Sequence, residues 1–378
     1  MISFTAPHQR GFFYPQIMKY IYYTSIFALL ISCSPKKTDS HADLVPETVY
    51  EIWVGSYTDS DNSDIYQLLL DSALQPVHIK EFGQLQNPSY IAWNPQDSLL
   101  IAVNEHPDTI PGEISTWRLK GDRFTMVNKV PSQSLYPCYF EVHNNTIYLA
   151  NYGGSIAQFK VDGNYKLQLL KNQIHTGSGT TSRQLSAHPH MITKVSDNQF
   201  LVTDLGTDHL YQYDSNLELI DSLALPAGSG PRHLTVRNDK IYVSLELSSE
   251  VAIISFDNQK LGSVVQQINT LETPDSTTEN YVSAIKIQGQ YLYVGNRGHN
   301  SISVYQIQED GTLEMTQIIQ GNVIWPRDFS FTPDGKFLIA GNQKDNSLSV
   351  FIRNTDGSLN FSHKIPGVYQ PSHVLVIE

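Results

Sequence analysis

A short run of alternating residues, as in Ile302-Ser303-Val304-Tyr305, recurs seven times along the chain. Neighbouring copies are separated by 49, 42, 54, 41, 51 and 46 residues, and they begin at Ile65, Ile114, Ile156, Leu210, Val251, Ile302 and Leu348. Such alternation over a few residues is typical of a β-strand. A repeat of this length is one supersecondary unit, and it buries its apolar face only by stacking against its neighbours.

Upstream of this strand, most repeats carry a strand that opens at a proline, then a turn, then a strand that ends in polar residues. One example runs from Gly230-Pro231-Arg232-His233 to Ser244-Leu245-Glu246-Leu247. Turn residues separate the two strands, most clearly at Thr332-Pro333-Asp334-Gly335. No segment after residue 50 shows a sustained 3.6-residue apolar period, so we expect no helix there. The repeat predicts an all-β fold, a seven-bladed β-propeller with four antiparallel strands per blade.

The seventh unit is divided between the two ends of the chain. The segment Gln370-Pro371-Ser372-His373 begins an inner strand that has nothing after it, and Glu51–Tyr57 forms a second strand with no inner strand before it. Pairing the C-terminal inner strand with the N-terminal strands completes this blade, closes the ring and removes exposed sheet edges. The alternative is a large β-sandwich with accidental spacing, which does not explain complementary half-units at the two ends.

Composition limits the partners. The chain has 25 Lys and Arg against 37 Asp and Glu, a net charge of −12, and its folded part contains no basic run. This balance argues against a nucleic-acid partner. The two cysteines are Cys33 and Cys138, and no Cys and His spacing resembles a zinc site. We therefore predict no cofactor and no metal, a monomer, and a small buried apolar role for Cys138.

The first 49 residues are predicted to be separate from the fold. Met18-Lys19 precedes an apolar stretch from Tyr20 to Ile31, and the chain continues through Ser32 to Cys33. A charged start, a short apolar core and small residues describe a secretory signal, and the stretch is too short to span a membrane comfortably. The ending resembles a bacterial lipoprotein signal with Cys33 as the lipidated residue. We expect residues 1–33 to be this signal, with translation starting at Met18, and residues 34–49 to be a flexible tether.

Hairpin geometry predicts which polar residues meet. The start of an inner strand and the end of its antiparallel neighbour lie at the same end of a blade, so across the ring these positions share one face around the central channel. We expect a ligand on this face. Its charged and imidazole side chains are Glu105, His188, His190, Asp204, Arg232, His233, Glu246, Arg297, His299, Arg327, Asp328, Lys344 and His373.

The arginines on this face have two interpretations. Guanidinium groups pair bidentately with carboxylate or phosphate, so Arg232, Arg297 and Arg327 indicate an anionic ligand. Alternatively, each arginine pairs with a nearby Asp or Glu and ties neighbouring blades together. Asp204, Glu246 and Asp328 are the candidates for that role.

The histidines are predicted from strand alternation. His188 and His190 are two residues apart and should project from the same side of an extended strand. Arg232 and His233 should project to opposite sides, so both are not expected to face a pocket. His190 is the candidate for acid–base work, because an imidazole titrates near neutral pH.

Several segments in order along the chain resemble one family. They are Gly55-Ser56-Tyr57-Thr58, Asn87-Pro88-Ser89-Tyr90, Ala150-Asn151-Tyr152-Gly153-Gly154, Asp204-Leu205-Gly206-Thr207-Asp208, Gly230-Pro231-Arg232-His233-Leu234, Asn296-Arg297-Gly298-His299 and Trp325-Pro326-Arg327-Asp328-Phe329. Together they resemble the seven-bladed lactonase family, which includes the propeller-type 6-phosphogluconolactonases and the fungal carboxymuconate cyclases. The resemblance covers residues 50–378, and His188-Pro189-His190 is similar to the family's His-Ala-His.

The resemblance implies an active site of one His, two Arg and one Glu. The matching positions are His190 (or His188), Arg232, Glu246 and Arg297. We assign catalysis to His190 and the other three, and substrate binding to His188, His233, His299, Arg327, Glu105 and Asp204.

The implied reaction is hydrolysis of a sugar lactone or another anionic lactone by activated water, in the manner of 6-phosphogluconolactonase. A lactone-forming reaction of the carboxymuconate cyclase type is the first alternative, and a non-catalytic binding propeller on the cell surface is the second. The export signal predicts a bacterial lipoprotein on the periplasmic or cell-surface side of a membrane, held there by its lipid anchor. Such a location favours a substrate that is not a cytosolic sugar phosphate.

Overall fold

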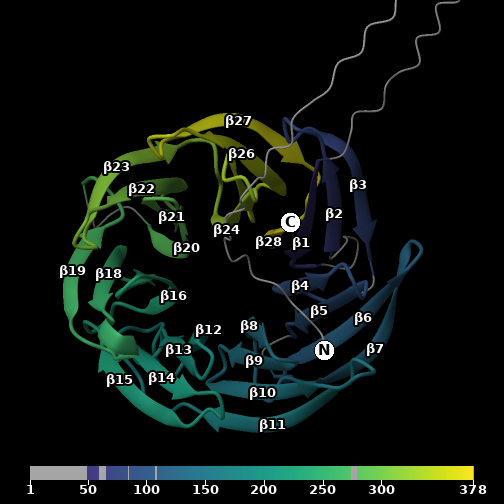
Figure 1. Cartoon of the computed structure of the whole chain (residues 1–378), viewed down its shortest axis with the longest axis horizontal. Helices are drawn as coiled ribbons and strands as arrows, with labels where there is room; N and C mark the ends of the chain where they lie inside the picture. The colour runs from purple at the N-terminus through teal and green to yellow at the C-terminus, as the bar shows by residue number, and fades with distance from the viewer. Residues whose placement is uncertain (1–48, 59–64, 84, 107–108, 274–278, 378) are drawn as a thin grey trace, which may run out of the picture.

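The computed structural model describes residues 49–58, 65–83, 85–106, 109–273 and 279–377. Seven four-stranded antiparallel sheets are arranged around a central channel, with one inner strand of each sheet toward the axis and one outer strand at the rim (Figure 1). The predicted seven-bladed β-propeller is confirmed. Within the described residues the sole helical element is a 3₁₀ turn, Asp257–Gln259.

Blades 1 to 6 each run from the inner to the outer strand in chain order. Blade 1 is β4 (Ile91–Asn94), β5 (Leu99–Asn104), β6 (Glu113–Lys120) and β7 (Arg123–Pro131). Blade 2 is β8 (Pro137–His143), β9 (Thr146–Asn151), β10 (Ser155–Val161) and β11 (Leu167–Ile174). Blade 3 is β12 (Pro189–Ser196), β13 (Gln199–Asp204), β14 (His209–Asp214) and β15 (Leu219–Ala224). Blade 4 is β16 (Pro231–Arg237), β17 (Lys240–Leu245), β18 (Glu250–Ser255) and β19 (Val264–Asn269).

The remaining three blades complete the ring. Blade 5 is β20 (Tyr281–Gln288), β21 (Tyr291–Arg297), β22 (Ser301–Ile307) and β23 (Leu313–Gln320). Blade 6 is β24 (Pro326–Phe331), β25 (Phe337–Asn342), β26 (Ser347–Arg353) and β27 (Leu359–Pro366). Blade 7 is β28 (Pro371–Ile377), β1 (Tyr50–Ser56), β2 (Ile65–Leu70) and β3 (Pro76–Phe82).

Blade 7 closes the ring as predicted. The C-terminal strand β28 is its inner strand and pairs antiparallel with β1, from Glu51 opposite Ile377 to Ser56 opposite Pro371. Because the two ends of the chain share one sheet, blade 7 has four strands like the other blades, and β1 is not left as a sheet edge.

The core lies between the blades. Each of the seven interfaces between neighbouring blades contains one cluster of buried apolar side chains, such as Val251 and Ile253 of blade 4 against Leu292 and Val294 of blade 5. Strands are therefore covered on both faces, which explains why the central strands read as nearly continuous buried runs. Each fully buried Leu, Ile or Val contributes roughly 1.5–3 kcal/mol to folding.

A β-bulge near the start of the inner strand recurs in six blades. In blade 3, Pro189 lies opposite Asp204 while Met191 already lies opposite Thr203, so His190 is the extra residue. The same shift follows Pro137, Pro231, Val282, Pro326 and Pro371. A bulge re-aims side chains and is over-represented next to binding sites.

Left-handed backbone precedes several of these prolines. Tyr136, Trp325 and Gln370 have φ values of 50°, 56° and 35°. A positive φ is uncommon for residues other than glycine. At the equivalent place in blade 4 the chain has Gly230, φ 62°, where an added Cβ would lie 2.5 Å from Cγ of Leu247.

The predicted signal at 1–33, its lipidation site Cys33 and residues 34–48 of the predicted tether lie outside the described residues. In the part of the chain that is described, no helix is both long and apolar enough to cross a membrane.

Candidate functional site

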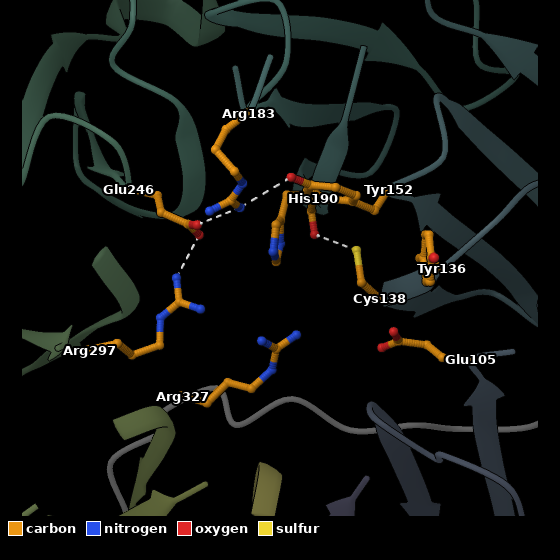
Figure 2. A pocket seen from close by; sticks show the side chains of 9 residues that line it. All are labelled: Glu105, Tyr136, Cys138, Tyr152, Arg183, His190, Glu246, Arg297 and Arg327. Carbon is orange, nitrogen blue, oxygen red and sulfur yellow. Dashed lines mark hydrogen bonds and ion pairs between the residues drawn. The ribbon is translucent and has the colours of Figure 1, made fainter. Parts of the chain in front are cut away.

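A pocket of about 300 Å³ opens at one end of the central channel, where the predicted face lies. Its walls come from blades 1 to 6 and from the loop between β11 and β12 (Figure 2). The lining residues are Glu105, Tyr136, Cys138, Tyr152, Arg183, His190, Glu246, Arg297 and Arg327.

Two positions in the blade repeat supply seven of the nine lining residues. The bulge in the inner strand turns Cys138, His190 and Arg327 toward it. The last residue of the second strand, or the residue just after it, supplies Glu105, Tyr152, Glu246 and Arg297.

Glu246 is held by three arginines. Oε2 of Glu246 lies 2.7 Å from Nη2 of Arg297 and 3.1 Å from Nε of Arg232, and Nη2 of Arg183 donates to Oε1 at 3.0 Å. Burial alone would raise the pKa of Glu246, but the three guanidinium groups hold it below its ordinary value. Glu246 is therefore an ionised countercharge for the arginines.

Arg232 lies beneath the pocket and does not line it. Its guanidinium faces a smaller cavity deeper in the channel and reaches the pocket through Glu246. Burial and the charges of Arg297 and Arg327 lower the pKa of Arg232. Its Nη1 is buried and has no hydrogen-bond partner among the described residues. A buried, under-satisfied cation of this kind favours a nearby anion.

His190 lies in the wall between the two cavities. Its ring meets Tyr152 edge to face at a centroid distance of 5.8 Å, and its Nδ1 is buried without a hydrogen-bond partner in the described part of the chain. Burial and the charges of Arg232, Arg327 and Arg297 hold the pKa of His190 well below its ordinary value. The imidazole is therefore neutral at physiological pH.

A second charged group lies on the other side of the pocket. Nη2 of Arg327 donates to the Tyr57 hydroxyl at 2.8 Å, and this hydroxyl donates to Oε1 of Glu105 at 3.0 Å. Burial raises the pKa of Glu105 above its ordinary value, although Arg327 and Tyr57 both lower it. Figure 2 shows Glu105 and Glu246 on opposite sides of the pocket, with His190 between them.

The ion pairs of the arginines agree in part with the blade-tying interpretation and in part with anion binding. Arg232 and Arg297 share Glu246, which lies between blades 4 and 5, so this part of the blade-tying interpretation holds. Arg327 does not pair with Asp328, whose carboxylate accepts from the amide of Val374 at 3.0 Å. Three guanidinium groups, those of Arg183, Arg232 and Arg297, surround one ionised Glu246. With Arg327 on the other side of the pocket, the site carries an excess of positive charge.

Four of the six predicted binding residues do not line the pocket: Asp204, His188 and His299, and also His233, which lines the smaller cavity. Asp204 is fully buried, and its oxygens are occupied by Nδ1 of His175 and by the amides of residues 188, 206 and 207. His188 precedes β12 and stacks on the outside of Tyr152 at a centroid distance of 4.2 Å. Nδ1 of His299 lies 2.8 Å from the Ser301 hydroxyl. Asp204 orders a loop, and the expectation that His188 and His190 project from one strand side is wrong because His188 lies before the strand.

The expectation that Arg232 and His233 face opposite sides is also wrong. Both line the smaller cavity, because the register shift between Pro231 and Leu234 interrupts the alternation of side chains. The rings of His233 and His190 are 5.2 Å apart. Burial and the Arg232 charge hold the pKa of His233 well below its ordinary value.

Sequence reasoning missed Arg183 because it belongs to no repeated position. It lies on the loop between β11 and β12, and the loop is anchored by the buried Gln184, whose Nε2 donates to the carbonyl of Leu205 at 2.8 Å. Cys138 is half-buried in the pocket wall and is not the buried apolar residue we predicted. Burial raises the pKa of its thiol to about 12, so it is not a nucleophile at neutral pH.

In the described ranges no three His, Cys, Asp or Glu side chains are grouped as they would need to be to hold a metal ion.

Comparison with known families now bears on this pocket. Residues 51–376 match the family described as "Lactonase, 7-bladed beta-propeller". This chain belongs to that family. The match spans the whole propeller, including every pocket-lining residue.

Two relatives and one solved structure give the extent of the likeness. The lactonase-family chain is 31% identical over 305 residues to the 6-phosphogluconolactonase of Bacillus subtilis, covering 76% of this chain and 86% of that protein. It is 32% identical over 297 residues to an uncharacterised protein of Lactococcus lactis, covering 74% of this chain and 85% of that one. A crystal structure of a Lactobacillus plantarum protein superimposes with a TM-score of 0.80 at 30% identity, covering 87% of this chain and 99% of that one. Family membership and the Bacillus relative support lactone hydrolysis as the general activity.

Proposed function

We propose that this protein hydrolyses a sugar lactone or another anionic lactone, in the manner of 6-phosphogluconolactonase. One observation carries this proposal: the pocket gathers three arginines around a neutral His190 on a chain of net charge −12. A positive pocket attracts an anionic small molecule, whereas the acidic remainder of the surface repels it. The name of the Bacillus subtilis relative supports the same substrate class.

Each pocket residue has a role in the proposed reaction. Water attacks the lactone carbonyl, and negative charge develops on the carbonyl oxygen. Arg297, which lines the pocket and is steadied by donating from Nε to the carbonyl of Tyr281 at 3.3 Å, stabilises that oxyanion. Arg183 and Arg327 hold the anionic substituent. Arg232 acts through Glu246, which keeps the guanidinium groups aligned.

Water, not a covalent nucleophile, opens the ring in this proposal. The sequence contains no Gly-x-Ser-x-Gly segment, and the Cys138 thiol in the pocket wall stays protonated. The same arginines would also bind a polycarboxylate, so lactone formation of the carboxymuconate cyclase type is the second candidate.

The test is a proton-release assay of residues 50–378 against sugar lactones with and without a phosphate group. We expect His190→Ala, Arg297→Ala and Arg232→Ala each to lower kcat/KM by about 10²-fold or more, the usual effect of removing one charge-stabilising group. The exposed substitution Arg123→Ala, on the outer strand β7, is the matched control and should leave turnover unchanged. Wild-type-like turnover in all three pocket variants would refute the site. If no lactone is opened, carboxymuconate is the next substrate to assay.

We also propose that the protein is exported and anchored through a lipid on Cys33, acts as a monomer, and meets its lactone outside the cytoplasm. The support is the arrangement of residues 18–33, which has the form of a lipoprotein signal.

A further inference from the structure

Three groups at the pocket are able to accept a proton from water: Glu246, His190 and Glu105. A general base must combine access to the substrate with sufficient basicity. The three groups differ in both respects.

Glu246 is already committed. Arg297 and Arg232 both lie against its Oε2, and Arg183 donates to its Oε1. A proton arriving on this carboxylate would have to displace one of these ion pairs, and the guanidinium groups keep the pKa of Glu246 below its ordinary value. Of the two carboxylates at the pocket, Glu246 is therefore a weaker base than Glu105.

His190 has access but lacks basicity. Its neutral ring lines the pocket, yet any imidazolium formed there would be buried beside three guanidinium groups. Burial and these charges hold the pKa of His190 well below its ordinary value. The imidazole suits hydrogen bonding to the substrate better than it suits holding a proton.

Glu105 has both access and basicity. It lies on the side of the pocket opposite the Glu246 cluster (Figure 2), and Tyr57 donates to its Oε1. The charged and titratable groups around it are Tyr57 from the end of β1, Arg327 from β24 and Cys138 from β8. Burial outweighs these neighbours and raises the pKa of Glu105, so it binds a proton more strongly than Glu246 does. Two carboxyl groups whose environments push their pKa values apart divide the roles of proton carrier and fixed charge.

We propose that Glu105 is the catalytic proton carrier of this pocket, first as general base and then as general acid, while Glu246 is a positioning residue for the arginines. The inference rests on the proposed lactone hydrolysis. Glu105 takes one proton from water as the hydroxide oxygen bonds to the carbonyl carbon. The bond between that carbon and the ring oxygen then breaks, and Glu105 returns the proton to the ring oxygen. The product is a hydroxy acid, which releases its own proton to solvent.

The first experiment uses Glu105→Gln and Glu105→Ala with whichever lactone the wild-type protein opens. We expect kcat to fall by about 10²–10⁴-fold with little change in KM, because the lost group moves a proton and does not hold the anion. Added formate should restore part of the activity of Glu105→Ala in a saturable way, since it supplies the missing carboxylate. His190→Ala is the matched control, which formate should not rescue. A Glu105→Gln protein that keeps a tenth or more of wild-type kcat would overturn the inference.

The second experiment follows kcat/KM against pH. Wild-type activity should fall toward acidic pH as Glu105 is protonated, and Glu105→Gln should lose this dependence. Tyr57→Phe removes a hydrogen bond that lowers the pKa of Glu105, so its acid limb should move to higher pH. A purely structural Glu105 would leave the limb unchanged in both variants, and that result would overturn the inference. If wild-type protein opens no lactone at all, the proposed function fails. If it does and these variants behave like wild type, the proton-carrier role alone fails.

Discussion

Replacing Glu246 with Gln tests whether one carboxylate holds the buried arginines together. The side chains of Glu246, Arg232 and Arg297 are 3%, 2% and 8% exposed, so their charges are withdrawn from water. Glutamine keeps the volume of the side chain and removes its charge. The two buried guanidinium groups would then face each other without a countercharge.

The expected magnitude follows from this burial. Removing one partner of a buried ion pair costs roughly 3–5 kcal/mol, because the other charge stays buried. Arg183 adds little, since its side chain is 48% exposed and exposed pairs contribute about 0–1 kcal/mol. An unfolding entropy of about 2.1 cal/mol/K per residue over roughly 330 residues gives ~0.7 kcal/mol/K, so Tm should fall by about 4–7 °C. Sulfate at about 100 times its Kd should return roughly 2.7 kcal/mol, or about 4 °C.

Thermal unfolding of the propeller, with and without sulfate, measures both effects. The control is Glu218→Gln, which removes an exposed ion pair to Lys171 and should shift Tm by less than about 1.5 °C. The lowered pKa of Glu246 also predicts how stability depends on pH. The ionised carboxylate stabilises the folded protein above the pKa that Glu246 has in the unfolded chain, about 4.3, and this stabilisation is lost as pH falls through the pKa in the folded protein. Wild type and variant should therefore converge only as the pH falls through the lowered folded pKa of Glu246, below its ordinary value. A Glu246→Gln protein that melts within 1 °C of wild type at pH 7 would refute the countercharge role.

Three further predictions concern other parts of the molecule. Inorganic phosphate should raise the pKa of His190, because a bound anion offsets the guanidinium charges that depress it; imidazole NMR titration checks this, and an unchanged pKa would argue against anion binding beside the ring. Asp204→Ala should lower the unfolding free energy by about 3 kcal/mol or more, since the ring nitrogen and three amides that it accepts from lose their acceptor. In urea, the exposed loop variant Asp162→Ala should lose much less unfolding free energy, and equal losses in the two variants would contradict the role of Asp204 in ordering its loop. Cys33→Ser should release the full chain from the membrane fraction, so continued membrane partitioning would refute lipidation.

The fold was predictable because its signals are local and repeated. Each blade places an alternating strand such as Ile302–Tyr305 at nearly the same spacing, and a two-residue period is hard to imitate with a helix. Closure of the ring was predictable because the C-terminal segment supplies an inner strand and the N-terminal segment supplies the strands that this blade lacks. β28 and β1 pair in the order that this requirement dictates.

The sequence predicted which face of the propeller carries the candidate site, but it did not predict in which direction the side chains on that face point. Alternation assumes a regular strand, and the bulge between Pro231 and Leu234 breaks it where the site is built. For this reason His233 and Arg232 share a cavity that alternation would have divided between two sides. Arg183 could not be found at all, because its loop has no counterpart in the other blades and the guanidinium reaches Glu246 only in three dimensions.

The bulge also explains how seven similar blades produce one asymmetric pocket. The residue after the proline lines one of the two cavities in blades 1, 2, 3, 4, 6 and 7, and its identity differs from blade to blade: Ser89, Cys138, His190, Arg232, Arg327 and Ser372. The residue around the end of the second strand varies in the same way, so that Glu105 and Glu246 occupy similar places in blades 1 and 4. Their backbones are equivalent, but their neighbours are not. Three guanidinium groups surround Glu246, whereas Glu105 has Tyr57 and one arginine. The difference in pKa between the two carboxyl groups therefore arises from which side chains the other blades contribute, and it is this difference that lets one carboxylate fix the arginines while the other moves the proton.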